Sequence, residues 1–152
     1  MLAAGTHHTL HPGDVVLAER GDTLETLLGS CVAIVLTDPR RSIGAMCHVV
    51  HSGTGTSTRS AEPALARMRQ LLLARGIVPA LCEAWVYGGG NMFPALVGEH
   101  HVGADNADWA LQALARERIP VLHQDLGGTG YRRLLWTIGP DEPQLRTTPV
   151  TA

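Results

Sequence analysis

The feature that most constrains the fold is a pair of apolar, β-prone segments joined by a short polar turn. Residues 31–37 read Cys-Val-Ala-Ile-Val-Leu-Thr, and residues 43–50 form the second segment. Asp38 and Pro39 lie between them. Proline presets the backbone of the second turn position and aspartate caps the first, so this pair is typical of a turn. The pattern predicts two strands joined as an antiparallel hairpin.

The hairpin brings a thiol and an imidazole together. With the turn centred between Pro39 and Arg40, Cys31 faces His48 across the two strands. Directly opposite residues have Cβ atoms roughly 4.5–5.5 Å apart on one face of a sheet, which allows a hydrogen bond between the two side chains. Cys47 then points to the other face and is interpreted as core. The prediction depends on register, because a slip of one residue turns every side chain to the opposite face.

A cysteine next to a histidine is a pattern for nucleophilic catalysis. A free thiol has a pKa of about 8.5, so a neighbouring imidazole must take its proton before the thiolate can attack an acyl carbon. Backbone N–H groups near Gly29 and Ser30 are candidates for stabilising the resulting oxyanion. The alternative interpretation of Cys31 is a buried core residue, since cysteine in an apolar strand is often no more than that.

The remaining pattern predicts a mixed α/β or α+β domain. Helices are expected at residues 60–75 and 105–116, and further strands at residues 81–87, 121–124 and 131–138. A chain of 152 residues with 45% hydrophobic residues fits a single domain over residues 1–152. Its core is expected at about residues 14–138, with flexible tails at residues 1–13 and 140–152.

Charge and cysteine usage exclude several classes of protein. The net charge of −2 comes with no long run of one sign, so neither a nucleic-acid partner nor a polybasic membrane surface is expected. No apolar stretch is long enough for a transmembrane helix, and the first eight residues do not resemble a signal peptide. Three cysteines, an odd number, argue against a disulfide framework. These observations together predict a cytoplasmic protein without membrane insertion.

An ordered set of motifs resembles the CheD family of chemoreceptor glutamine deamidases. It begins with Leu-Gly-Ser-Cys-Val at residues 28–32, continues with Asp38-Pro39, and reaches Ile-Gly-Ala-Met-Cys-His at residues 43–48. The similarity extends to a glycine-rich segment and to the closing strands, at residues 87–92, Val97-Gly98-Glu99, residues 119–121, 125–128 and 130–133.

The resemblance implies a role for individual residues. Cys31 matches the nucleophile of the family and His48 matches its histidine partner. The third catalytic residue of the family is a threonine a few positions before the cysteine. Thr26 is the nearer candidate and Thr23 the more distant one, while Glu25 is an alternative occupant of the matching position. The implied fold is layered, with two packed mixed β-sheets flanked by helices.

The implied reaction is hydrolysis of protein-bound glutamine to glutamate with release of ammonia, and it needs no cofactor and no metal. The implied substrates are methyl-accepting chemotaxis receptors, and in some organisms the family also pairs with CheC-type phosphatases. The chain departs from the family pattern at Cys47, in the segment after His48 without its leucine-proline, and at His100-His101, and the expected helix at residues 60–75 matches only loosely. These departures touch neither Cys31 nor His48, but they bear on substrate fit.

Three other functions compete with deamidation: a metal site, a non-catalytic adaptor and a methyl-ester hydrolase. His7-His8, His100-His101 and the group Cys47, His48 and His51 suggest a metal site, but no Cys-x-x-Cys occurs and adjacent histidines on a strand face opposite ways. A non-catalytic adaptor would keep the fold and bind receptor or phosphatase, although it would need neither Cys31 nor His48. Hydrolysis of receptor methyl esters would use the same residues on a different leaving group.

Overall fold

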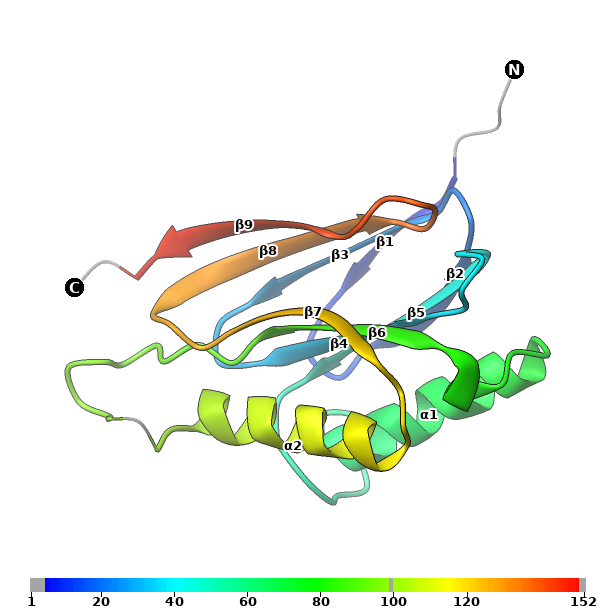
Figure 1. The fold of residues 1–152 in the computed structure, drawn as a ribbon. Helices are drawn as coiled ribbons and strands as arrows, with labels where there is room; N and C mark the ends of the chain where they lie inside the picture. The colour runs from blue at the N-terminus through cyan, green and yellow to red at the C-terminus, as the bar shows by residue number, and fades with distance from the viewer. Residues whose placement is uncertain (1–4, 99, 151–152) are drawn as a thin grey trace.

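Two β-sheets pack face to face, and two helices cover the outer face of one of them (Figure 1). This arrangement is seen in a computed structural model that describes residues 5–98 and 100–150. The four-stranded sheet has the order β1 (His7–Leu10), β3 (Thr23–Leu28), β8 (Gly130–Thr137) and β9 (Gln144–Pro149). The five-stranded sheet has the order β2 (Val15–Glu19), β5 (Ile43–Val49), β4 (Val32–Thr37), β6 (Glu83–Gly88) and β7 (Val121–Leu126).

The helices and the two hydrophobic cores complete the layers. Helix α1 (Ala61–Ala74) and helix α2 (Val102–Arg116) lie on the same side of the five-stranded sheet (Figure 1), and a 3₁₀ turn at Pro79–Leu81 precedes β6. One core fills the space between these helices and the sheet, and the other fills the space between the two sheets. All six residues of β4 are buried, because this strand is covered on both faces. Each sheet contains one parallel and several antiparallel pairs, so the predicted α+β fold with two packed mixed sheets is confirmed.

The prediction of flexible tails is wrong for two segments. β1 pairs in parallel with β3, and β9 pairs antiparallel with β8, so both belong to the four-stranded sheet. Both strands lie at the edges of this sheet and are mostly exposed. Backbone hydrogen bonds hold them in place, and these bonds leave no hydrophobic pattern in the amino-acid sequence. β2 and β3 were also not expected from the pattern. Glu99, which belongs to one of the motifs, and residues 1–4 and 151–152 lie outside the described residues.

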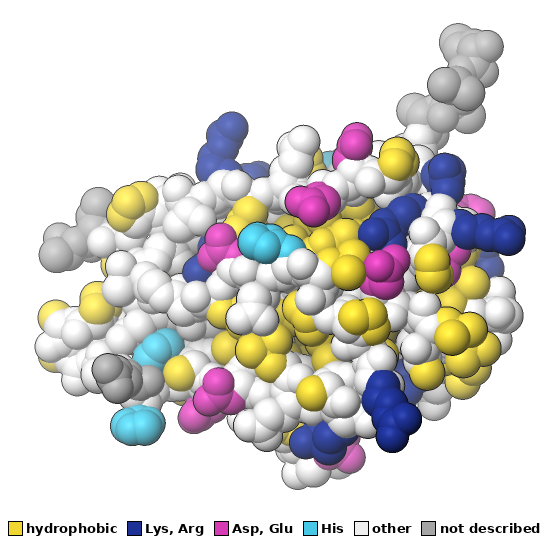
Figure 2. Space-filling model, viewed as in Figure 1, with side chains coloured by type: hydrophobic (Ala, Val, Ile, Leu, Met, Phe, Trp, Pro, Cys, Tyr) yellow, Lys and Arg dark blue, Asp and Glu magenta, His cyan; other side chains and the backbone are white. Residues whose placement is uncertain are grey.

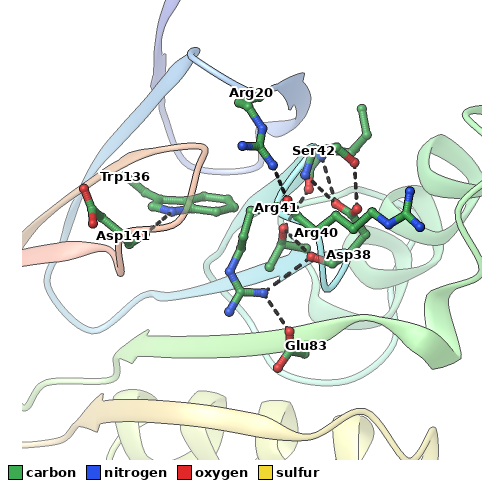
Figure 3. Close-up of polar contacts among 10 residues, drawn as sticks. Arg20, Asp38, Arg40, Arg41, Ser42, Glu83, Trp136 and Asp141 are labelled. Atoms are coloured by element: carbon green, nitrogen blue, oxygen red, sulfur yellow. Dashed lines mark hydrogen bonds and ion pairs between the residues drawn. The ribbon is translucent and has the colours of Figure 1, made fainter.

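The predicted hairpin forms, but its register is shifted by two residues. The structure pairs Thr37 with Gly44 and Ala33 with His48, where Cys31 was expected to face His48. The reason is a wider loop, in which the Asp38 carboxylate accepts hydrogen bonds from the Ser42 and Ile43 N–H groups at 2.9 Å and from the Ser42 hydroxyl at 2.6 Å (Figure 3). Arg41 adopts a left-handed backbone in this loop, with φ of 55°. The hydrophobic pattern does not encode this conformation.

Because the shift is an even number of residues, it preserves the face of every side chain. His48 still points into the space between the two sheets, with Ala33 and Met46 on the same face. Cys47 points to the opposite face from His48, as predicted; the helices cover this face, and Cys47 is fully buried there. The loop also anchors the end of the sandwich, since Arg41 donates to Glu83 at 2.7 Å (Figure 3). The Arg41 guanidinium also stacks 4.9 Å above the centre of the Trp85 ring.

Both predicted helices are present. α1 follows Ser60 in the N-cap position and ends before Gly76, as expected. α2 begins at Val102, three residues earlier than predicted, because the His101 ring accepts a hydrogen bond from the Ala104 N–H at 3.3 Å and caps the first turn. Among the residues that the structure describes, neither helix is both long and apolar enough to cross a bilayer. Figure 2 shows basic, acidic and apolar side chains interspersed on one face of the molecule.

The close packing of the two sheets predicts the effect of adding one methyl group. A Cβ at Gly44 would lie 2.4 Å from Trp136 and 2.9 Å from Ile138, inside the core between the sheets. We expect Gly44→Ala to lower the free energy of unfolding by about 1–3 kcal/mol through overpacking. Gly98→Ala is the control, because the added methyl meets no atom within 4 Å among the described residues beyond its chain neighbours. Urea unfolding measures both, and equal midpoints for the two variants would contradict the packing.

Candidate active site

The candidate site lies where the chain crosses from one sheet to the other. β3 ends at Leu28, and β4 of the other sheet begins at Val32, so residues 29–31 form the crossing. Cys31 is half-buried at its end and packs against the core between the sheets. A pocket of about 570 Å³ opens beside it, and this pocket is lined by Thr26, Cys31 and His48 among other residues.

The structure brings Cys31 and His48 to one face of the hairpin as diagonal neighbours. His48 faces Ala33 on β4, and Cys31 precedes Ala33 by two residues. Diagonal neighbours of this kind are about 7–8 Å apart and remain within reach of long side chains. Within the described part of the chain the thiol and the ring share the pocket without a direct hydrogen bond. Catalytic hydrogen bonds are often long before substrate binds, so this geometry is compatible with proton transfer.

Thr26 is the threonine that contacts the histidine. Its Oγ1 lies 2.7 Å from Nδ1 of His48 and donates a hydrogen bond to the Leu10 carbonyl at 2.8 Å. A hydroxyl has only one proton, and it is used on Leu10. Oγ1 must therefore accept a hydrogen bond from the Nδ1–H of His48. This tautomer leaves Nε2 as the unprotonated nitrogen that can act as a base.

The competing candidates for the third residue bond to side chains other than His48. Glu25 points to the outer face of β3, where its carboxylate lies 2.9 Å from Nε2 of His7 and accepts from Arg133 at 2.7 Å. Thr23 bonds to the Thr137 hydroxyl at 2.9 Å, away from the pocket. Glu25 and Arg133 also line the pocket and place one charge of each sign at its rim.

Burial makes both reacting groups neutral near pH 7. His48 is only 3% exposed, and this burial lowers the pKa of its ring to about 4, although the nearby Asp14 charge acts in the opposite direction. Burial also raises the pKa of the Cys31 thiol. Near pH 7 the pocket therefore holds a thiol and a neutral imidazole, and forming a thiolate there would require the thiol proton to be transferred.

The carbonyl groups of the crossing, residues 29–31, accept hydrogen bonds that hold its backbone in place. The Gly90 N–H donates to the Gly29 carbonyl at 3.0 Å, and the Gly89 N–H donates to the Cys31 carbonyl at 2.9 Å. Asn106 donates to the Ser30 carbonyl at 3.2 Å. The N–H groups of Ser30 and Cys31 donate no hydrogen bond within residues 5–98 and 100–150. Two successive free N–H groups beside a thiol are suited to bind an oxyanion.

Close approach of the backbone explains Gly88, the last residue of β6 and the first glycine of the glycine-rich motif. Gly88 has φ of 117°, and a Cβ at this position would lie 2.2 Å from the Cys31 carbonyl oxygen. Only glycine allows β6 to hold the crossing at this distance. The glycine-rich segment therefore supports Cys31, the candidate nucleophile, through its backbone.

Cys47 and Cys82 differ from Cys31 in environment. Both are buried, and burial raises the pKa of Cys47 to about 12 and that of Cys82 to about 11. Reactive cysteines are partly exposed, so neither is suited to be a nucleophile. Across the described residues no three His, Cys, Asp or Glu side chains gather in a way that would hold a metal ion.

Sequence reasoning missed three contributors to the site. The Leu10 carbonyl, which orders Thr26, lies in an expected tail. Arg133 lines the pocket, whereas the motif at residues 130–133 assigned it no role. Of the three, Asn106 could have been noticed in the sequence. It is a polar residue on the buried helix face that also carries Ala107 and Ala110, which is unusual unless the side chain has a partner.

Comparisons with known proteins agree on one family. The model of the CheD family, described as CheD chemotactic sensory transduction, matches residues 48–144. A probable chemoreceptor glutamine deamidase CheD from Pseudomonas savastanoi pv. phaseolicola is 36% identical over 151 residues, which cover 94% of this chain and 85% of that protein. A second relative, probable chemoreceptor glutamine deamidase CheD 2 from Albidiferax ferrireducens, is 36% identical over 85% of this chain and 80% of its own length.

One solved structure resembles the fold alone. The Bacillus licheniformis hypothetical protein YfiH superimposes with a TM-score of 0.50 at 14% identity, over 81% of this chain and 60% of that one. Its likeness supports the arrangement of two mixed sheets and helices.

The buried histidine predicts a pH dependence of stability. The His48 ring has a pKa of about 4 when folded, whereas an unfolded chain has the ordinary value of about 6.5. Between these pH values the unfolded state binds more protons, so this contribution is complete above pH 6.5 and is lost as the pH falls toward 4. We expect an NMR titration of the His48 ring, assigned with His48→Gln, to show a midpoint near 4. A midpoint near 6.5 would contradict the burial.

The Thr26 hydroxyl predicts a second effect. Thr26→Val keeps the shape of the side chain but leaves the His48 Nδ1–H without its partner and removes the side-chain donor to the Leu10 carbonyl. A buried unpaired group costs about 1–3 kcal/mol, so we expect urea unfolding to show a loss of at least that size. Thr26→Ser should retain most of the stability, and Thr23→Val serves as the control outside the pocket. A valine variant as stable as the wild type would show that the hydroxyl does not order the ring.

Proposed function

Because this chain belongs to the CheD family, we propose that it hydrolyses glutamine side chains of methyl-accepting chemoreceptors to glutamate and releases ammonia. The observation that carries the proposal is the convergence of Cys31, His48 and Thr26 on one pocket. The proposed substrate is the cytoplasmic part of the receptor, so the site of action is the cytoplasm. A CheC-type phosphatase as a further partner stays a prediction from the family resemblance.

The first half of the proposed reaction forms a thioester. Nε2 of His48 accepts the proton of the Cys31 thiol while the sulfur attacks the carboxamide carbon of the substrate. The carbonyl oxygen becomes an oxyanion and accepts hydrogen bonds from the N–H groups of Ser30 and Cys31. The imidazolium then gives its proton to the amide nitrogen, the C–N bond breaks, and ammonia leaves.

The second half restores the enzyme. Nε2 of His48 removes a proton from a water molecule, and the resulting hydroxide attacks the thioester carbon. The tetrahedral intermediate collapses, the glutamate carboxyl leaves, and the sulfur regains its proton from the imidazolium. One water is consumed and one ammonia is released, with no change in oxidation state and no cofactor.

The proton positions explain why a buried pair suits this reaction. Thr26 accepts from Nδ1–H, so the base on Nε2 faces the pocket in both steps. Once protonated, a ring whose pKa is lowered to about 4 is a stronger acid than an ordinary imidazolium, so it gives up its proton readily to a departing amine. The raised pKa of the thiol makes the thiolate, once formed, a strong nucleophile.

The adaptor function is the main rival. It would need the fold and an exposed surface, but not a histidine held in one tautomer beside a thiol. Deamidation is favoured because Thr26 orders the His48 ring at a position that binding alone does not require. Methyl-ester hydrolysis would use the same residues, and analysis of the released product distinguishes it.

The deamidation test uses a purified cytoplasmic fragment of a chemoreceptor from the same organism. We expect wild-type protein to release ammonia and to convert specific glutamines to glutamates in the intact-mass and peptide-mass spectra. Cys31→Ala should abolish both signals, because no other residue of the pocket supplies a thiol.

Cys47→Ala is the matched control, since it removes a thiol on the helix side of the same hairpin. It should retain deamidase activity after circular dichroism confirms its fold. Methanol release in place of ammonia would indicate esterase activity. Receptor binding without either product would favour the adaptor, and full activity of Cys31→Ala would reject the assigned nucleophile.

A further inference from the structure

Asn106 is a buried polar residue on the face of α2 that packs against the five-stranded sheet. Only 1% of it is exposed, and its neighbours on this face are mostly small and apolar. Its Nδ2 donates to the Ser30 carbonyl at 3.2 Å and to the Val50 carbonyl at 2.9 Å. Ser30 immediately precedes the candidate nucleophile, and Val50 follows the candidate base by two residues. One side chain therefore ties the two halves of the site together.

The orientation of this amide follows from its neighbours. Both groups that it contacts are carbonyl oxygens, which only accept, so the NH₂ end of the amide must face them. Its Oδ1 is buried and has no partner among the described residues. An unpaired buried acceptor is unfavourable for folding, and an alanine like its helical neighbours would avoid it. Helix packing therefore does not explain an asparagine here.

The bond to Ser30 fixes the direction of a neighbouring N–H group. The Ser30 carbonyl and the Cys31 N–H belong to the same peptide unit, and in a trans peptide these two groups point in opposite directions. Asn106 attracts the carbonyl toward α2, which covers the outer face of the five-stranded sheet (Figure 1). The Cys31 N–H must then point to the other face, where His48 and the pocket lie.

The carbonyls of Gly29 and Cys31, on either side of Ser30, are oriented without the help of a side chain. Both are held by backbone N–H groups of the segment after β6, which would be present with almost any sequence that folds this way. The Ser30 carbonyl is held by a side chain, so its orientation depends on one residue.

We propose that Asn106 is a positioning residue, which orients the Ser30–Cys31 peptide so that the Cys31 N–H stabilises the oxyanion. The catalytic consequence rests on the proposed deamidation. Asn106 touches neither the substrate nor the sulfur, and it acts through the peptide that it holds.

This role predicts a particular split in the kinetics. The oxyanion exists only in the transition state and the tetrahedral intermediates, so losing one donor lowers kcat by about 10²-fold and leaves KM unchanged. Alkylation of Cys31 by iodoacetamide passes through no oxyanion, so its rate should not change. A general loss of structure would lower both rates together.

The experiment compares Asn106→Ala and Asn106→Asp with the wild type, using the chemoreceptor deamidation assay and iodoacetamide alkylation. The aspartate variant keeps the shape of the side chain but loses both N–H donors when ionised. Gln112→Ala is the matched control, because it removes an exposed amide from the same helix. A fall in kcat with unchanged KM and unchanged alkylation supports the proposal. Unchanged kcat in a folded variant overturns it, as does a parallel fall of both rates.

Two further measurements decide the inference without deamidase activity. In the wild type, NMR hydrogen exchange should show protected Asn106 side-chain amide protons, and free exchange would overturn the proposal even if both variants fail to fold. A crystal structure of Asn106→Ala should show the Ser30–Cys31 peptide rotated, and an unchanged peptide would overturn it. If the wild type itself modifies no receptor, the proposed function fails while these two measurements still test the role of Asn106.

Discussion

The hydrogen bond between Thr26 and His48 is the interaction on which the site depends. Thr26 belongs to the four-stranded sheet and His48 to the five-stranded sheet, so this bond joins the two layers across their core. Both side chains are almost completely buried, and each polar atom there needs a partner. The Leu10 carbonyl takes the single hydroxyl proton, and the ring is therefore held with Nε2 free. The two hydrogen bonds of the Thr26 hydroxyl therefore stabilise the sandwich and fix which nitrogen of the His48 ring carries the proton.

The site occupies the place where the chain passes between the sheets, and this location has a physical advantage. Residues 29–31 are not part of either ladder, so their N–H groups are not consumed by strand pairing. Their carbonyls are held from two sides, by the segment after β6 and by Asn106 on α2. Anchoring through carbonyls leaves the N–H groups of Ser30 and Cys31 oriented and, among the described residues, without an acceptor. A thiol, an imidazole and two available N–H groups can thus meet without breaking the regular structure around them.

Much of the fold followed from local pattern. The apolar run at β4 and the amphipathic helices are features of consecutive residues, and their predicted bounds agree with the structure to within a few positions. The edge strands β1 and β9 were missed, because a mostly exposed strand is held by backbone hydrogen bonds to residues far away in the chain. The hairpin register was wrong by two residues, yet Cys31 and His48 stayed on one face. The alternation of side chains has a period of two, so an even error does not separate them.

The sequence by itself determined that a thiol and an imidazole share one face of a hairpin, and that Cys47 faces away from them. It also contained the motifs that indicate the CheD family. Only the tertiary structure decided which neighbour orders the histidine, because Thr26 and Glu25 are adjacent in sequence and differ in which side of β3 they occupy. It likewise decided the low pKa of His48 and the contact of Asn106 with Ser30. Burial and hydrogen bonding depend on residues from distant strands and helices, and no local pattern records which of these will meet.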